Sequence, residues 1–373
     1  MNTARLRKIL FFSLLFSFTI LLSGCVTKSE IKKTITDELN LLKNLDSETV
    51  RKYISYDELF PDTSGGFSST DEIEEVFSLF FKDFDYKIMD IDIDNKTDKA
   101  DASVRFFTID ANSLAKDFMR ELLKAEILKA ASDSPEDASG QSLSMEDHYL
   151  LLNHLLKSNS YKRTETNCII ELILSDSQND QWEIKRTVSL ENNLVGGLMA
   201  YLSDPDILSP EETLDVYLST IKNMSLEEMV SYLDLEAILN SDDPDKSKLA
   251  EALANQMHKH FDFSLGQCAV NGYQATVPVD ITTFDSNAIL SAYQTAFEKY
   301  LESSDAVIDG SEKRRQKSLE FLLKTIKENT QTKTDSMDFT LINDGISWKL
   351  QNGGKALSQA FFGDLSSSDN NLL

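Results

Sequence analysis

The sequence predicts an α+β fold made of two cone-shaped copies of one unit, each with helices packed on a curved antiparallel sheet. Three observations support this prediction: an internal repeat, paired strands in which apolar and polar residues alternate, and a phase slip at the same place in both copies. The composition agrees, because 41% of the 373 residues are apolar and Gly and Pro number only 13 and 6, as is typical of globular proteins.

The repeat is visible as short motifs that recur in the same order at a slowly shrinking spacing. Phe84-Asp85-Tyr86 recurs as Phe261-Asp262-Phe263, and Trp182-Glu183-Ile184 recurs as Trp348-Lys349-Leu350. A fixed order with drifting spacing is the pattern of a duplication with small loop deletions.

Apolar periodicity predicts the same series in each copy: two helices, a hairpin, two more helices and a closing hairpin. In the first copy the expected elements are 38–53, 71–82, 84–93, 100–106, 114–131, 145–157, 164–174 and 182–188. In the second copy they are 213–232, 246–259, 261–270, 275–281, 289–301, 312–328, 335–342 and 346–350.

The first strand of each copy changes phase part of the way along. In copy one the apolar alternation slips between Ile88 and Met89, and in copy two it slips between Leu265 and Cys268, beside Gly266. An extra residue in one strand of a pair produces such a slip, so we expect a β-bulge that bends each sheet.

Turn and cap residues follow at matching positions. Asn95-Lys96 and Asn271-Gly272 are expected to form the hairpin turns, and Asn-Gly is a strong two-residue turn signal. Asp110 and Asp285 stand where a helix N-cap belongs, and an aspartate there accepts hydrogen bonds from free backbone N–H groups.

The N-terminus has the form of a signal peptide. A basic start, with Arg5, Arg7 and Lys8, precedes an apolar run over 9–22 that is shorter than a membrane span. Leu22-Ser23-Gly24-Cys25 then resembles the lipobox of bacterial lipoproteins, although a plain secretory peptide is the alternative. The resemblance implies that 1–24 is removed, that Cys25 is lipidated, and that two acyl chains hold the protein on the extracytoplasmic face of the cell membrane.

The rest of the chain divides into a lipidated linker, two domains and a tail. We expect the linker over 25–37, the first domain over 38–203, the second over 209–362 and a disordered tail over 363–373. Ser209 followed by Pro210 and two glutamates marks the start of the second domain, because this is the pattern of a helix N-terminus.

The element order, the bulge and the Trp-x-Ile/Leu closing strands resemble the nuclear-transport-factor-two-like, or cystatin-like, cone. Two such cones behind a lipobox are similar to a family of lipoproteins of Gram-positive bacteria. The resemblance implies a cavity inside each cone and no fixed chemistry.

Charge argues against one class of partner. The chain has 37 Lys and Arg against 62 Asp and Glu, a formal charge of -25, and nucleic-acid binding needs clustered cations to displace counterions from phosphates. One basic cluster, Lys313, Arg314, Arg315 and Lys317, could meet an anionic wall polymer or lipid headgroup, but a solvated helix face is the favoured interpretation.

The sequence gives little support for a metal or redox site. Five aspartates have calcium-loop spacing, but Asn95 occupies the position of the usual turn glycine, so a solvated strand is favoured. The four histidines lack ligand spacing, and the two remaining cysteines are expected to act as small apolar residues rather than an interdomain disulfide. The five aspartates are Asp90, Asp92, Asp94, Asp98 and Asp101, and the two cysteines are Cys168 and Cys268. No cofactor is predicted.

The sequence favours a non-catalytic surface lipoprotein that binds a small ligand or a partner protein. We expect the ligand in the first cone, bounded by Tyr86, Ala102, Phe106 and Trp182, unless these side chains simply fill a core. An enzyme with its active site in a cone cavity is the first alternative. Its candidate bases would be Asp85 and Asp262, but strand alternation predicts that both side chains point outward, away from the cavity. A transporter-associated solute-binding protein is the second, although paired hairpins argue against its parallel sheets.

Overall fold

The computed structural model describes residues 27–54, 59–60, 71–94, 96–132, 143–175, 181–233, 244–351, 357 and 360–361. The chain forms two compact units, Met1–Phe118 with Leu143–Ser203 and Met119–Ser142 with Asp204–Leu373. Their boundary falls inside helix α5 (Ala111–Ser132). The sequence assigned this whole helix to the first domain, whereas its later turns group with the second unit. The signal segment, Cys25 and the tail over 363–373 lie outside the described residues.

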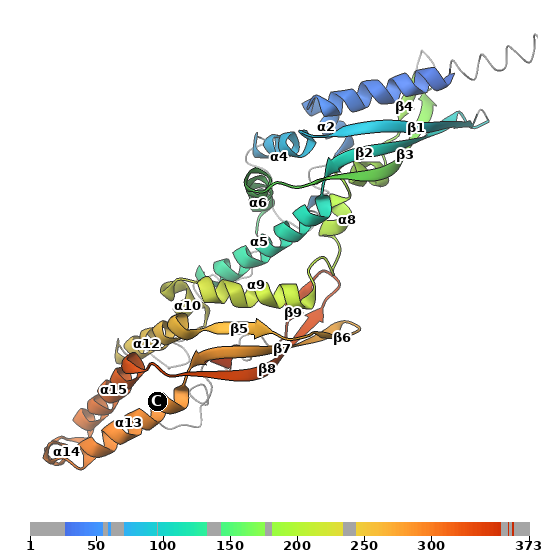
Figure 1. Ribbon diagram of the computed structural model, residues 1–373. Coiled ribbons are helices and arrows are strands. Elements are labelled where there is room, and N and C mark those ends of the chain that lie inside the picture. Colours follow the sequence, from blue (N-terminus) through green and yellow to red (C-terminus); the bar gives the residue numbers. More distant parts are fainter. Residues whose placement is uncertain are drawn as a thin grey trace, which may run out of the picture. The chain divides into compact units, whose positions relative to one another are not determined.

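The first unit begins with a helix over 27–43, dark blue in Figure 1. Ile31, Ile35, Leu39 and Leu42 form its buried stripe, at the three- and four-residue spacing of a helix face. Much of the expected linker over 25–37 is therefore helical. The helix expected over 38–53 is interrupted at Leu45, which has a φ of 62°, before a second helix begins.

Among the described residues, six further helices lie wholly or partly in this unit, and several of their starts follow capping rules. Asp46, Ser144 and Thr187 accept hydrogen bonds from the first turns of α2, α6 and α7, which satisfies N–H groups that have no partner within the helix. The helices are α2 (Ser47–Tyr53), α4 (Asp71–Phe81), α5, α6 (Met145–Ser158), α7 (Val188–Leu194) and α8 (Leu198–Leu202).

The sheet of the first unit is antiparallel, with the order β1-β2-β3-β4. The alternating side chains of β2 that were expected to face inward, Ala100, Ala102, Val104 and Phe106, are all buried. The closing strand is shorter than expected, because Thr187 caps α7 where the sequence suggested strand. The strands are β1 (Asp85–Asp94), β2 (Lys99–Ile109), β3 (Arg163–Ser175) and β4 (Gln181–Ile184).

The second unit repeats this order in the structure. Its helices α9 and α12 pack on strand β7, and α15 packs on α12 and α13. Its strands are joined in the order β5-β7-β8-β9, with β6 also paired to β7. The elements are α9 (Pro210–Asn223), α10 (Leu226–Tyr232), α12 (Pro244–His260), β5 (Asp262–Leu265), β6 (Ala269–Asn271), β7 (Gln274–Phe284), α13 (Ser286–Leu301), α14 (Ser304–Ile308), α15 (Ser311–Glu328), β8 (Thr332–Asn343) and β9 (Trp348–Leu350). The predicted α+β class is confirmed.

The core of the second unit includes a contribution from α5. Ile127 and Ala131 of that helix are buried in the same apolar cluster as Leu214, Val277 and Phe339. Part of the core of the second unit therefore comes from α5, which precedes α6, α7 and α8 of the first unit along the chain.

The predicted bulge is present in both sheets. In copy one, Ile88 pairs with Val104 and Asp90 with Ser103, so Met89 is the extra residue, and it is 49% exposed. In copy two, Gly266–Cys268 lie between the end of β5 and the start of β6, opposite Val277 and Pro278. The Gly266 N–H donates to the Pro278 carbonyl at 2.7 Å, which anchors the irregular segment.

Asp110 and Asp285 cap α5 and α13 as predicted, through backbone N–H groups of Ser113 and of Asn287 and Ala288. The second hairpin turn is shifted by one residue. Asn271 pairs with Gln274 as the last strand residue, so the turn consists of Gly272 and Tyr273. Gly272 has a φ of +63°, a left-handed conformation that glycine adopts without steric cost. Asn95, in the first predicted turn, lies outside the described residues.

Candidate functional site

The four side chains predicted to bound a first-copy pocket lie in or beside the core. Ala102 and Phe106 are 0% exposed, and the Phe106 ring lies 5.7 Å from that of Phe84. Tyr86 pairs across the strands with Phe106, whereas Trp182 lies on β4 and is 8% exposed. The structure thus places these residues against close neighbours, and ligand binding there stays a prediction.

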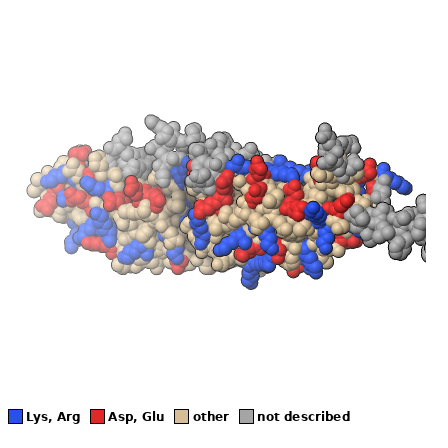
Figure 2. All heavy atoms as spheres, turned by 90° about the horizontal axis from the view of Figure 1, so that it is seen from above, with Lys and Arg blue, Asp and Glu red and all other residues tan. Residues whose placement is uncertain are grey.

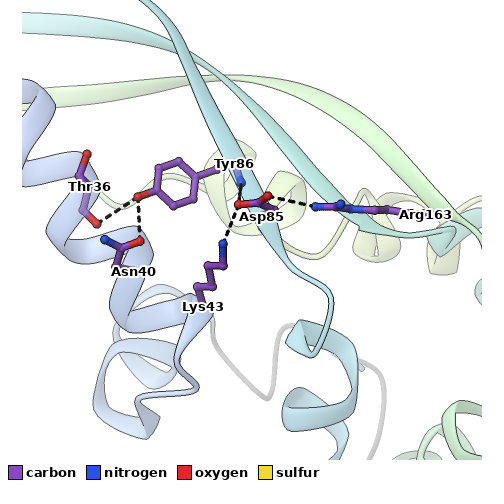
Figure 3. Close-up of polar contacts among 6 residues, drawn as sticks. All are labelled: Thr36, Asn40, Lys43, Asp85, Tyr86 and Arg163. Carbon is purple, nitrogen blue, oxygen red and sulfur yellow. Dashed lines mark hydrogen bonds and ion pairs between the residues drawn. The ribbon is translucent and has the colours of Figure 1, made fainter.

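Tyr86 belongs to a polar group that joins the helix over 27–43 to the start of β1 (Figure 3). Its hydroxyl lies 3.0 Å from Asn40 Oδ1 and 3.3 Å from the Thr36 carbonyl oxygen. Burial raises the pKa of Tyr86, so the phenol stays protonated and can donate.

The neighbouring Asp85 lies in an ion pair. Lys43 Nζ is 2.9 Å from Asp85 Oδ1, and Arg163 is 3.5 Å from the other oxygen. The hydrogen bond from Lys43 is the main reason that the pKa of Asp85 lies below its ordinary value. A carboxylate held by two cations is a poor general base, because its proton affinity is low.

The second copy repeats this ion pair. Lys222 Nζ lies 2.7 Å from Asp262 Oδ1, and that hydrogen bond lowers the pKa of Asp262. Both pairs link the end of the first long helix to the first residue of the first strand. A contact present in both copies at this joint is explained by the fold that the copies share, without a catalytic role.

The five aspartates with calcium-loop spacing lie mainly along paired strands. Asp92 lies opposite Asp101 on the neighbouring strand, and Asp101 lies opposite Glu171 on the next, so three carboxylates form a row across the sheet. Asp94 instead accepts hydrogen bonds within the hairpin turn. Within the described ranges, no three His, Cys, Asp or Glu side chains are arranged to hold a metal ion.

The basic cluster of α15 is neutralised by its own surroundings. Lys313 pairs with Asp309, Arg315 with Glu312 and Lys317 with Glu320, at 2.7, 3.1 and 2.7 Å. Arg314 donates to the Ala306 carbonyl at 2.8 Å. Figure 2 shows Lys and Arg interspersed with Asp and Glu on the visible face. These pairs support the interpretation as a solvated helix face. Cys168 and Cys268 are both free thiols.

A small pocket in the second unit has the properties of a ligand site. It has a volume of about 220 Å³, and its walls are mainly apolar, with a few polar groups, the usual composition of a binding site. Three stretches of chain supply its lining, together with Thr213 of α9. They are Met119, Leu122, Leu123 and Glu126 of α5, then Pro205, Ile207 and Leu208, then Ile346, Ser347, Trp348 and Lys349.

Helical spacing explains the α5 wall. Met119 and Glu126 are each three or four positions from Leu122 and Leu123, so the four residues lie along one face of the helix. Ile127, next to that face, is buried in the core of the second unit and fixes the helix against it. The sequence signal was this apolar stripe, which continues past the end of the first unit.

Trp348 forms a fixed wall of the pocket. It is 5% exposed, and its indole Nε1–H donates to Asp206 Oδ1 at 2.8 Å. Asn343 Nδ2 donates to the same oxygen at 3.1 Å, so Asp206 is itself held in place. Trp348 is the second-copy counterpart of Trp182, which the sequence placed at the boundary of a first-copy pocket.

Two charged side chains reach the pocket. Lys349 is paired with Asp344 at 2.5 Å, and this hydrogen bond is the main cause that lowers the pKa of Asp344 to about 2. Glu126, in contrast, makes no hydrogen bond or ion pair with any described residue. Its side chain is exposed, but the protein atoms close to it exclude part of the surrounding water and raise its pKa, although the nearby Lys349 charge acts in the opposite direction.

Two other hollows are less suited to a ligand. One of about 340 Å³ lies between α2 and α4, and its rim carboxylates are engaged, Glu74 with Arg51 and Glu75 with Lys157. The other, of about 650 Å³, is formed by polar side chains on the first sheet and the start of α7. Phe77 is the one aromatic residue in the described lining of the first hollow, and the described lining of the second has none.

Among the described residues, none of the helices is long and apolar enough to span a bilayer. No protein-family model matches the chain, and no curated protein matches it. A search of solved structures finds the crystal structure of YcdA, a candidate lipoprotein of Bacillus subtilis. The two chains are 12% identical, the match covers 74% of this chain and 96% of that chain, and the TM-score is 0.27. A TM-score this low supports no inference about this chain.

Proposed function

We propose that the protein is a non-catalytic lipoprotein, anchored through Cys25 on the extracytoplasmic face of the membrane, and that its second unit binds a small apolar ligand beside Trp348. The observation on which binding rests is the pocket of about 220 Å³ with a tryptophan wall fixed by Asp206. Concave apolar sites with few polar groups are the usual places for small ligands.

The anchor rests on the sequence, through the signal-like N-terminus and the lipobox resemblance at Cys25. We also propose that both units are cystatin-like cones. The same strand order, the bulge in each first strand and the matching Lys–Asp pairs support this. Duplication then leaves one copy free to acquire the pocket while the other keeps a filled core.

The alternatives receive less support from the described residues. Asp85 and Asp262, the candidate bases, are held in ion pairs that lower their pKa values. A solute-binding protein of a transporter would need parallel strands, but every strand pair formed by the described residues is antiparallel.

The test uses Trp348 as a reporter. The chain has two tryptophans, so in the Trp182→Phe variant all of the tryptophan fluorescence comes from Trp348. Titration of the variant, produced from residue 26 onward, with benzyl alcohol should give a saturable change in emission. Ser347→Leu, which fills the pocket, should abolish that change without lowering the melting temperature.

The matched control is Ser264→Leu, the same substitution at an exposed position of β5 outside the pocket lining. It should leave the titration unchanged. A linear, non-saturating response in the parent protein would contradict ligand binding at Trp348.

A further inference from the structure

We infer that the ligand of the Trp348 pocket carries a positively charged, ammonium-type head that pairs with Glu126. This inference rests on the proposed function, and it adds the charge and size of the ligand to it. It follows from which charged groups at the pocket already have partners and which one does not.

Glu126 lies at one end of the α5 wall. It follows Met119 by seven residues, two helical turns, so its carboxylate marks one end of the row of lining side chains. Leu122 and Leu123 lie between them on the same face. A ligand lying along this face would have its apolar part against the leucines and its head at Glu126.

The charge balance at this end of the pocket is negative. The Lys349 ammonium is 2.5 Å from Asp344, so this pair has no net charge. Arg120 pairs with Glu212 at 2.6 Å and Lys124 with Glu121 at 3.3 Å, so the other nearby cations of α5 are also matched. Asp206 is a further anion, and the two described hydrogen bonds that its carboxylate accepts come from neutral donors.

Glu126 is therefore an exposed carboxylate in the pocket lining, without a described partner. The protein atoms close to it exclude part of the surrounding water, and this raises its pKa. A ligand cation adds a charge-assisted hydrogen bond to this carboxylate, whereas a ligand anion is repelled.

The volume limits the apolar part. A cavity of roughly 150 Å³ is sufficient for benzene, so about 220 Å³ accepts one ring or one short branched chain with a small head. The class is thus a small hydrophobic amine, free or as the side chain of a short peptide.

The experiment compares three probes with one shape and different charge: benzylamine, benzyl alcohol and benzoate. Ligand-detected NMR on the chain from residue 26 onward measures the three affinities at pH 7 and low salt. Benzylamine should bind about tenfold more tightly than benzyl alcohol, and benzoate should bind more weakly than either. High salt should reduce the preference, because charges near solvent are screened.

Glu126→Gln tests the residue directly. It keeps the size and removes the charge, so benzylamine should fall to the affinity of benzyl alcohol, while benzyl alcohol should be unaffected. Glu121→Gln is the matched control, the same change on the same helix outside the pocket lining, and it should keep the tenfold preference.

The outcomes separate the two proposals. Binding of benzyl alcohol with no preference for benzylamine, or a preference that survives Glu126→Gln, would overturn the assignment of an ammonium ligand and leave the pocket function standing. Failure of all three probes to bind would overturn both.

Discussion

Lys43 Nζ lies 2.9 Å from Asp85 Oδ1, and the same contact recurs between Lys222 and Asp262 at 2.7 Å. Each pair joins the end of a long helix to the first residue of a strand. The two copies differ in one respect, because Arg163 adds a second cation only in the first. The counterpart of Arg163, judged from strand pairing, is Thr332.

Removing the charge of Asp85 should have a small and pH-dependent effect. Both partners are nearly half exposed, so we expect Asp85→Asn to lower the free energy of unfolding by about 0.2–1 kcal/mol at pH 7. The native pKa of Asp85 is depressed. The contribution of Asp85 to the free energy of unfolding is therefore fully present above the pKa of an unfolded aspartate, about 3.9. It is lost as the pH falls through the lower pKa of Asp85 in the folded protein.

Urea unfolding at pH 7 and at pH 2.5 measures this difference. Asp98→Asn, at the far end of the same hairpin, is the control and should have no comparable effect. An Asp85→Asn penalty that persists unchanged at the lower pH would show that the ion pair is not its source.

Ala102 tests whether the first copy has a filled core. Its side chain is 0% exposed, so Ala102→Leu should lower the free energy of unfolding by about 1–3 kcal/mol, because the added methyl groups displace close-packed neighbours. Ser103→Leu, on the exposed face of the same strand, should have little effect. An unchanged melting temperature for Ala102→Leu would instead indicate empty space at the predicted first-copy site.

The parts of the fold that sequence predicts correctly depend on short-range patterns. Alternation in β2 and β7, the slip at Met89, and the caps at Asp110 and Asp285 each follow from residues within a few positions of one another. Interactions between residues close together in the chain determine these features, so they can be predicted from a single sequence.

The features that sequence missed depend on contacts between distant segments. The Trp348 pocket needs Glu126, Ile207 and Ile346 together, although they are far apart along the chain. Nothing in the α5 sequence says that its later turns leave the first unit, because the apolar stripe of a helix does not specify which core covers it. The first helix ends before Leu45, which has a positive φ. Nothing in the local sequence indicates that a leucine adopts this conformation.

The later turns of α5 should stabilise the second unit. Ile127 is 4% exposed within the second core, so Ile127→Ala should cost about 2–5 kcal/mol by leaving a cavity. Hydrogen exchange should quicken in β7 and remain unchanged in β2. Lys124→Ala, at an exposed position of the same helix, is the control. Equal acceleration in both sheets would mean that the two units unfold together.

Cys25 should be required for membrane attachment. Cys25→Ala removes the thiol that the lipobox resemblance marks for acylation, so the protein should move from the membrane fraction to the medium or a soluble fraction. Gly24→Ala keeps a small residue before the cysteine and should retain anchoring. Membrane retention of Cys25→Ala would contradict the lipid anchor, and it would leave the pocket experiments unaffected.

The hydrogen bond from Trp348 to Asp206 should be measurable as a coupling between the two side chains. Asp206→Ala removes the acceptor and Trp348→Phe removes the donor while keeping an aromatic ring. Since Asp206 is solvent-exposed, we expect a coupling free energy of about 1 kcal/mol in a double-mutant cycle followed by urea unfolding. The same double-mutant cycle, measured as affinity for benzyl alcohol, tells whether the hydrogen bond also positions Trp348 for binding. If Asp206 holds the indole in its binding position, Asp206→Ala should reduce the affinity for benzyl alcohol several-fold in the protein with Trp348 and have no effect in the Trp348→Phe protein. Equal losses in both backgrounds would show that Asp206 acts on the pocket by another route than the tryptophan.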